Sequence, residues 1–189
     1  MHRASPAVLV WPALVVALGA ILACRAEPKA PDPAALVEKL KSHDATVSGA
    51  ASLELIRLGE PATPALADLL HDPDTAMRAL AARTFWGMGA RAGSVAVSAL
   101  AEALGDADAS VRVGAAMALE NMGPSAAAAV PALIRALRDR DPKVRPWAAR
   151  ALGSIGPAAE AAVPALQRAG RLDGVQGPAE EAIRKIRTR

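Results

Sequence analysis

Residues 141–156 read DPKVRPWAARALGSIG, and two further stretches follow the same plan: DTAMRALAARTFWGMG at 74–89 and DASVRVGAAMALENMG at 108–123. A fourth and more distant copy, DATVSGAASLELIRLG, occupies residues 44–59. The starts at 44, 74, 108 and 141 lie 30, 34 and 33 residues apart. A period of this length that contains two helical segments is typical of a helical solenoid.

Each copy has the start and stop signals of one helix. An aspartate at the start can accept hydrogen bonds from the amides of the first turn, and a glycine at the end can adopt the left-handed backbone that closes a helix. Between these signals, apolar residues recur at spacings of four, four and three, as in Val111, Ala115, Leu119 and Met122, which places them on one helix face. The aspartates are Asp44, Asp74, Asp108 and Asp141, and the glycines are Gly59, Gly89, Gly123 and Gly156.

A second helical element recurs between the copies, as in PATPALADLLHD at 61–72 and AAVPALIRALRD at 128–139. The composition agrees with an all-helical chain, because aromatic residues, which strands favour, make up only 2% of it. One apolar helix face has nothing to pack against alone, so neighbouring units must supply the core. The sequence therefore predicts an all-α solenoid of about five helical hairpins.

These units resemble HEAT repeats, particularly the short, Ala-rich bacterial kind first noted in phycobilisome lyases. The resemblance covers residues 33–189 and implies a right-handed α-solenoid of HEAT-like hairpins. In HEAT repeats a proline often bends the first helix, and Pro64, Pro131 and Pro164 fit that pattern, whereas Ser98 stands in their place in one unit.

The resemblance also implies a ladder of ion pairs between units. In that family an aspartate in the turn and an arginine six residues later stack from one unit to the next. The first unit departs from the pattern, with Ser42 and Ser48 at these two positions. The matching residues are Asp72 with Arg78, Asp106 with Arg112, and Asp139 with Arg145.

The start of the chain, MHRASPAVLVWPALVVALGAILAC, is similar to a bacterial lipoprotein signal. The resemblance implies a signal peptide over 1–23, a lipid with palmitate-type acyl chains on Cys24, and a tether over 24–32 before the repeat domain at 33–189. Cys24 is the only cysteine. We therefore expect a lipid-anchored protein of the bacterial cell envelope, on the outer membrane or the periplasmic face rather than in the cytoplasm. The alternative is that the apolar run stays as a membrane anchor.

Several kinds of chemistry are not expected. The net charge is only +3, without the basic stripe of a nucleic-acid binder. His43 and His71 have no cysteine partner, and no Glu or His at i+3 or i+4 on a helix, so we predict no metal site. We predict no cofactor, no catalytic residues and no small-molecule substrate, since acid–base pairs that repeat in every unit are spread out rather than converging on one site. The alternative to a non-enzymatic scaffold is an accessory enzyme or a chromophore-lyase-like HEAT protein.

HEAT-like solenoids bind through the concave face, which the second helix of each unit lines, so this face is the predicted site for an unidentified protein or peptide. Counting 100° per residue from the core face identifies an exposed stripe that is more apolar than a solvated surface. Tryptophan and arginine are enriched at binding hot spots. Lateral packing between units is the other interpretation of the stripe, and an envelope spacer without a specific ligand is a third. The stripe consists of Leu53, Ile56, Arg83, Trp86, Met117 and Arg150.

Overall fold

The computed structural model describes residues 31–188, and a compact unit begins at Asp32. The predicted signal peptide over 1–23, the lipidated Cys24 and the tether up to residue 30 lie outside the described residues. The described part folds into five helical hairpins and contains no strand. The all-α solenoid predicted from the repeat is thereby confirmed.

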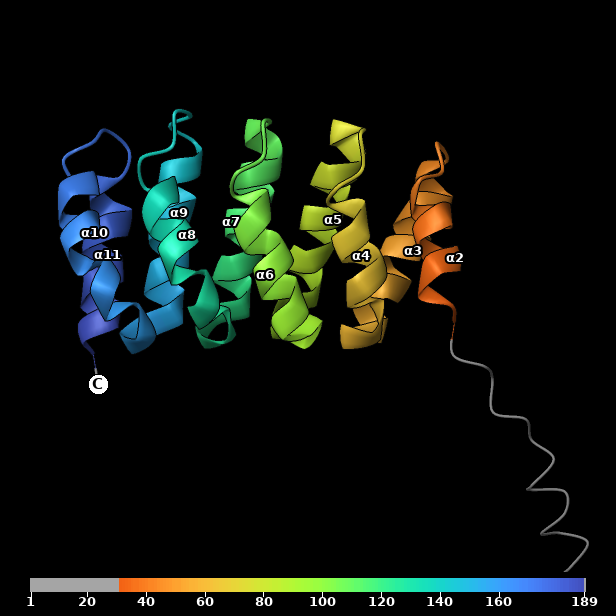
Figure 1. The fold of residues 1–189 in the computed structure, drawn as a ribbon, viewed down its shortest axis with the longest axis horizontal. Helices are drawn as coiled ribbons and strands as arrows, with labels where there is room; N and C mark the ends of the chain where they lie inside the picture. Colours follow the sequence, from red (N-terminus) through yellow and green to blue (C-terminus); the bar gives the residue numbers. More distant parts are fainter. Residues whose placement is uncertain (1–30, 189) are drawn as a thin grey trace, which may run out of the picture. The chain divides into compact units, whose positions relative to one another are not determined.

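The hairpins lie side by side in chain order, with first helices on one side of the row and second helices on the other (Figure 1). The first helices are α2 (Pro33–Leu40), α4 (Thr63–Leu69), α6 (Gly93–Ala103), α8 (Val130–Ala136) and α10 (Val163–Ala169). The second helices are α3 (Ala45–Leu58), α5 (Thr75–Met88), α7 (Ala109–Met122), α9 (Val144–Ile155) and α11 (Gln176–Arg187). Short 3₁₀ segments join the hairpins: η1 (Glu60–Ala62), η2 (Gly89–Ala92), η3 (Gly123–Ala129) and η4 (Gly156–Ala162).

Three of the four predicted capping aspartates begin a second helix. The carboxylates of Asp44, Asp74 and Asp108 each accept an N–H of the first turn at 2.8 Å. The prediction that Asp141 caps α9 is wrong in register, because α9 begins only at Val144. The carboxylate of Asp141 instead accepts the N–H of Lys143 in the turn before the helix. Pro146 explains the delay, since it lacks the N–H that would bond four residues back along the chain.

The prolines of the first helices stand at the starts of these helices. In α4, α8 and α10 a proline stands at the second position, directly after a 3₁₀ segment, and each of these α-helices has 7 residues. The unit with Ser98 has no such proline, and its α6 runs for 11 residues from Gly93. The loss of one proline therefore lengthens one first helix.

The core is a single row of apolar side chains between the two helix layers. Equivalent leucines recur in it because each unit supplies the same positions. Alanine and glycine let the second helices approach closely, and a Cβ placed on Gly153 would lie 2.8 Å from the Cα of Ala182 in the next hairpin. Fully buried members are Leu55, Phe85, Leu119 and Leu152 from the second helices, and Leu66, Leu100, Leu133 and Leu166 from the first.

The open side of the first described hairpin differs from the inner units. Val47 is 40% exposed there, although its equivalents Val111 and Val144 are fully buried. The repeat positions of Lys39 and Glu54 are occupied by buried residues in the following unit. A polar outer face is what the end of a stacked array needs, because no neighbour covers it.

Candidate functional site

The most regular polar feature of the described chain is an arginine that bridges two units. Arg112 donates from Nε and Nη2 to the two carboxylate oxygens of Asp139, at 2.8 and 2.7 Å. Its Nη1 donates to the carbonyl oxygens of Asp106 and Ala107, at 2.9 and 3.1 Å. The Arg112 and Asp139 side chains are only 5% and 9% exposed. One guanidinium thus connects the turn of its own unit to the turn of the next.

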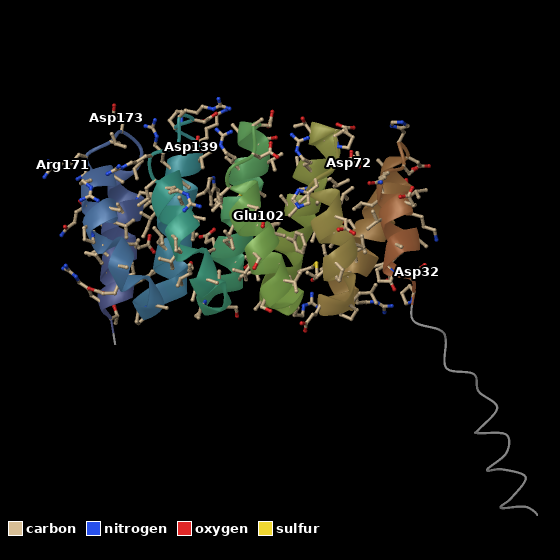
Figure 2. All side chains as sticks on the ribbon, in the orientation of Figure 1. Asp32, Asp72, Glu102, Asp139, Arg171 and Asp173 are labelled. Atoms are coloured by element: carbon tan, nitrogen blue, oxygen red, sulfur yellow. The ribbon has the colours of Figure 1, made fainter. Side chains whose placement is uncertain are left out.

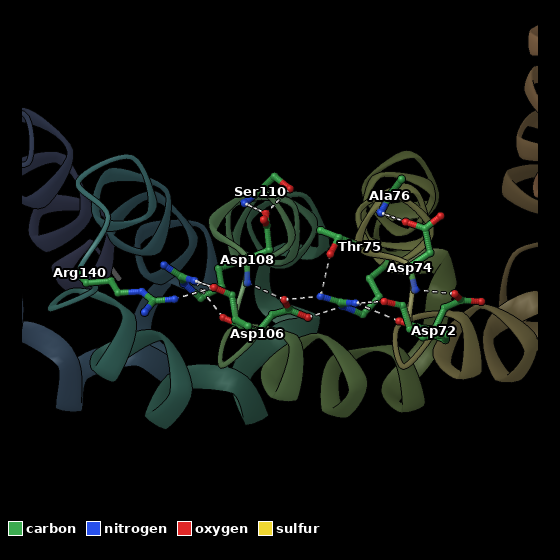
Figure 3. Close-up of polar contacts among 12 residues, drawn as sticks. Asp72, Asp74, Thr75, Ala76, Asp106, Asp108, Ser110 and Arg140 are labelled. Carbon is green, nitrogen blue, oxygen red and sulfur yellow. Dashed lines mark hydrogen bonds and ion pairs between the residues drawn. The ribbon is translucent and has the colours of Figure 1, made fainter.

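The same geometry recurs one unit earlier. Arg78 donates to both carboxylate oxygens of Asp106, at 2.7 and 3.1 Å, and to the carbonyl oxygen of Asp72 at 3.0 Å (Figure 3). In each rung, the aspartate six residues before the arginine therefore offers its backbone carbonyl, while the carboxylate comes from the following unit. Asp72 and Asp139 lie toward the same end of the hairpins (Figure 2).

The two ends of the ladder are different. Arg145 donates to the carbonyl oxygen of Asp139 at 2.6 Å and makes no ion pair within residues 31–188. At the other end, Lys41 Nζ lies 3.7 Å from the carboxylate of Asp72, and Ser48 donates to the carbonyl oxygen of Leu40. The ladder is thus complete only between the inner units.

The ladder shifts the pKa of its members in favour of their charged forms. The hydrogen bond from Arg78 lowers the pKa of the Asp106 carboxyl and outweighs the opposing effect of burial. Burial raises the pKa of Asp139, but the hydrogen bonds from Arg112 and the N–H of Asp141, with the charges of Arg112 and Arg140, together outweigh burial, so the net shift of the pKa is downward. The paired groups remain charged and mutually satisfied at neutral pH, which suits them to joining repeats.

Three residues of the predicted stripe do come together. Arg83 and Trp86 on α5 and Met117 on α7 line a groove of about 270 Å³ between these two second helices. Trp86 is 45% exposed. Arg83 is exposed and makes no hydrogen bond or ion pair within residues 31–188. The remaining lining residues are Ala79, Ser110, Val113 and Gly114.

The other three stripe residues lie elsewhere. Leu53 is 70% exposed and lines no part of this groove. Ile56 packs against the core. Its side chain fills the space that the missing side chain of Gly87 leaves on α5, since a Cβ placed on Gly87 would lie 2.5 Å from the Cδ1 of Ile56. For Ile56, lateral packing is therefore the right interpretation. Arg150 lines a separate groove of about 220 Å³ with Glu120, Glu181 and Lys185.

Two polar features near the stripe were not predicted. Asn121 donates from Nδ2 to the carbonyl oxygen of Trp86 at 2.7 Å, which fixes the end of α5 against α7. The guanidinium of Arg150 lies 4.8 Å from the ring centroid of Trp147, in a cation–π contact. The three-residue spacing of Trp147 and Arg150 on one helix was a signal for this contact.

A larger hollow of about 510 Å³, also not predicted, lies on the side of the first helices between α6 and α8. Its walls are largely small residues, which leave the space, and its charged groups are Glu102, Arg135 and Asp139. Asp139 already belongs to the ladder, and no aromatic side chain lines the hollow. In the sequence, the run of alanines at 126–129 with Ala132 and Ala136 could have indicated this hollow. The groove between α5 and α7 is smaller but has the side chains suited to binding.

No three or more His, Cys, Asp or Glu side chains in residues 31–188 are grouped as a metal site would require. None of the described helices combines the length and the apolar character that a bilayer crossing needs.

Five stacked helical hairpins, joined by an arginine ladder and offering a groove on their second helices, define an α-solenoid repeat protein. Residues 97–184 match the family model described as HEAT repeats, which confirms that the units resemble HEAT repeats. A search of curated proteins gives no match.

Solved structures share the fold over most of the chain. An engineered protein is 27% identical, with a TM-score of 0.61, covering 82% of this chain and 78% of that one. The complex of CpcE and CpcF of phycocyanin lyase from Nostoc sp. PCC7120 is 22% identical, with a TM-score of 0.67 and coverage of 80% and 97%. A designed armadillo repeat protein in complex with the peptide (KR)4 is 19% identical, with a TM-score of 0.62 and coverage of 81% of both chains.

Proposed function

We propose that this protein is a membrane-anchored scaffold lipoprotein of the bacterial envelope that binds a protein or peptide and catalyses no reaction of its own. The observation that carries the binding role is the groove between α5 and α7, where a half-exposed Trp86 lies beside Arg83, whose guanidinium has no ion-pair partner within residues 31–188. Both residue types are enriched at hot spots, where an aromatic ring supplies contact area and a guanidinium supplies directed donors. The designed armadillo relative that carries a peptide supports this role by analogy of fold.

The pair must be free to bind rather than needed for packing. Ile56, at the position equivalent to Trp86, fills a gap over Gly87, whereas the position equivalent to Gly87 in the next unit holds Asn121. Asn121 occupies the corresponding space and bonds to the carbonyl oxygen of Trp86, so the indole has no such gap to enter. Trp86 therefore remains at the surface beside the groove.

A pull-down from envelope extract tests the binding role. The full chain, Trp86→Ala and Arg83→Ala are compared with Val95→Ala, which removes a 55% exposed apolar side chain from a first helix. We expect both groove variants to lose the partner by at least fivefold and the control to retain it. Circular dichroism establishes that each variant is folded. Unchanged recovery by folded Trp86→Ala would exclude the groove as the site.

Mass spectrometry of the mature protein tests the anchor separately. We expect the first 23 residues to be removed and acyl chains to be attached at Cys24, the only cysteine. Two or more acyl chains hold a protein firmly at a membrane, at about 0.8 kcal/mol per buried methylene. An intact Met1 and an unmodified Cys24 would refute the lipoprotein assignment and leave the binding role standing.

An accessory enzyme of the chromophore-lyase kind is the second candidate, favoured by the likeness to the phycocyanin lyase subunits. At 22% identity that likeness concerns the fold. Incubation of the purified chain with a phycobilin, followed by absorption spectroscopy, tests it. A shifted and intensified visible band that withstands gel filtration would favour the lyase-like candidate over a plain scaffold.

A further inference from the structure

We infer that the groove between α5 and α7 binds an acidic peptide segment, with a carboxylate on the Arg83 guanidinium and an apolar side chain against Trp86 and Met117. This inference rests on the proposed binding function and specifies the chemistry of the partner. It follows from the charge of the groove, from its size, and from the way the stripe position changes along the array.

The charge of the groove comes from one residue. Arg83 is its only charged lining residue, and no acidic side chain lines it. The other arginine of α5, Arg78, is committed to the carboxylate of Asp106 and the carbonyl oxygen of Asp72. A free guanidinium presents donors in a planar fork that matches a carboxylate. The groove is therefore complementary to an acid, the opposite of the basic peptide bound by the designed armadillo relative.

The size of the groove favours a peptide over a small molecule. Its volume of about 270 Å³ lies just below that of ligand pockets, which run from about 300 to 1,000 Å³. Its apolar wall is formed by Trp86, Met117, Val113 and Ala79. Such a wall accommodates one or two side chains, while the rest of a peptide would extend across the neighbouring second helices.

The repeat position of Arg83 carries a second arginine farther along the array. Arg83 and Arg150 are equivalent residues two units apart, with the apolar Met117 between them. Packed helices lie about 8–10 Å apart, so two units span up to about 20 Å, or six residues of an extended chain. Carboxylates six residues apart also point to the same side of an extended peptide. Glu120 and Glu181 line the groove beside Arg150, which makes the second contact the weaker one.

The test uses the peptide acetyl-GESLSGSEG-amide, whose two glutamates are six residues apart and whose leucine faces the same side. Binding to the full chain in non-ionic detergent at low salt is measured by isothermal titration calorimetry. The matched peptides are GQSLSGSQG, which removes both charges, GKSLSGSKG, which reverses them, and (KR)4. The variants are Arg83→Glu and Trp86→Ala, and Arg168→Glu is the control, since it makes the same charge change on the exposed side of α10.

We expect sub-millimolar binding of the glutamate peptide, at least fivefold weaker binding of the glutamine peptide, and none of (KR)4. Arg83→Glu should weaken glutamate-peptide binding at least tenfold and make the lysine peptide the better ligand, whereas Arg168→Glu should change little. Higher salt should weaken binding, because the contact is exposed. The inference is overturned if the glutamate peptide does not bind at 1 mM, if it binds no better than (KR)4, or if Arg83→Glu binds it normally. If the envelope partner still depends on Trp86 in that case, the proposed function stands and only the acidic specificity falls.

Discussion

Replacing Arg112 with leucine should be the most destabilising single change in the ladder. It removes two hydrogen bonds to the carboxylate of Asp139 and two to the carbonyl oxygens of Asp106 and Ala107. Asp139 is 9% exposed and would keep only the N–H of Asp141 as a donor. Removing one partner of a buried ion pair costs about 3–5 kcal/mol, because the other charge stays uncompensated. Since Asp139 retains one donor, we expect about 3 kcal/mol.

Arg145→Leu is the matched control, because Arg145 occupies the same position one unit later. Its guanidinium donates to the carbonyl oxygen of Asp139 and to no carboxylate in the described chain, so its removal costs one hydrogen bond, or about 1 kcal/mol. The assay is thermal unfolding of the full chain, followed by circular dichroism at 222 nm. At roughly 2–4 °C per kcal/mol for a domain of this size, Arg112→Leu should lower Tm by about 6–12 °C and Arg145→Leu by about 2–4 °C.

The double variant Arg112→Leu with Asp139→Leu separates two explanations of that loss. If an uncompensated carboxylate causes most of it, the double variant should be less destabilised than the sum of the two single variants. Equal Tm losses for Arg112→Leu and Arg145→Leu would refute the reasoning, because only the first breaks an ion pair. Strict additivity in the double variant would show that the two side chains do not act as a pair.

Three further predictions concern stability. Gly153→Ala should destabilise the protein by about 1–3 kcal/mol, because the new Cβ would lie 2.8 Å from the Cα of Ala182; a urea midpoint equal to that of the parent would contradict it. Gly49→Ala, with nothing within 4 Å of the new Cβ inside α3, should stabilise by about 0.5–1 kcal/mol, and a lower midpoint would count against it. Asp106→Asn should be less stable than the parent at pH 7. The gap should close as the pH falls below about 4, because the pKa of Asp106 is lowered by Arg78 and its stabilisation is lost on protonation; a gap independent of pH would argue against this.

The repeat made much of the fold predictable from the sequence. Aligned capping aspartates, terminal glycines and the 4-4-3 apolar spacing locate helix ends and core faces, and Leu119 and Leu152 are buried as that spacing requires. The register of α9 was not predictable from the alignment alone. The aspartate at 141 is in its usual place, but Pro146 removes an amide that the first turn of the other second helices uses.

The site was less predictable, because it depends on what the neighbouring unit supplies. Sequence spacing relates Arg78 to Asp72, but it does not reveal that the carboxylate comes from Asp106 of the next unit. Ile56 and Trp86 hold equivalent positions and look alike as apolar stripe residues. One is packed and the other half-exposed because Gly87 leaves a gap for the isoleucine, whereas Asn121 occupies the corresponding gap beside the tryptophan.

The contrast between repeated and varied positions separates the residues that hold the array together from those that we propose bind a partner. The ladder repeats the same residue types because each rung joins two turns of fixed geometry, and any change leaves a nearly buried charge without its partner. The exposed position changes from Leu53 to Arg83, Met117 and Arg150 in successive units. No backbone hydrogen bond or core contact requires one residue type there, so this position can vary without affecting the fold. A solenoid built this way can vary this row without losing stability, and in this chain the row places the Arg83 guanidinium in the groove that Trp86 of the adjacent row also lines.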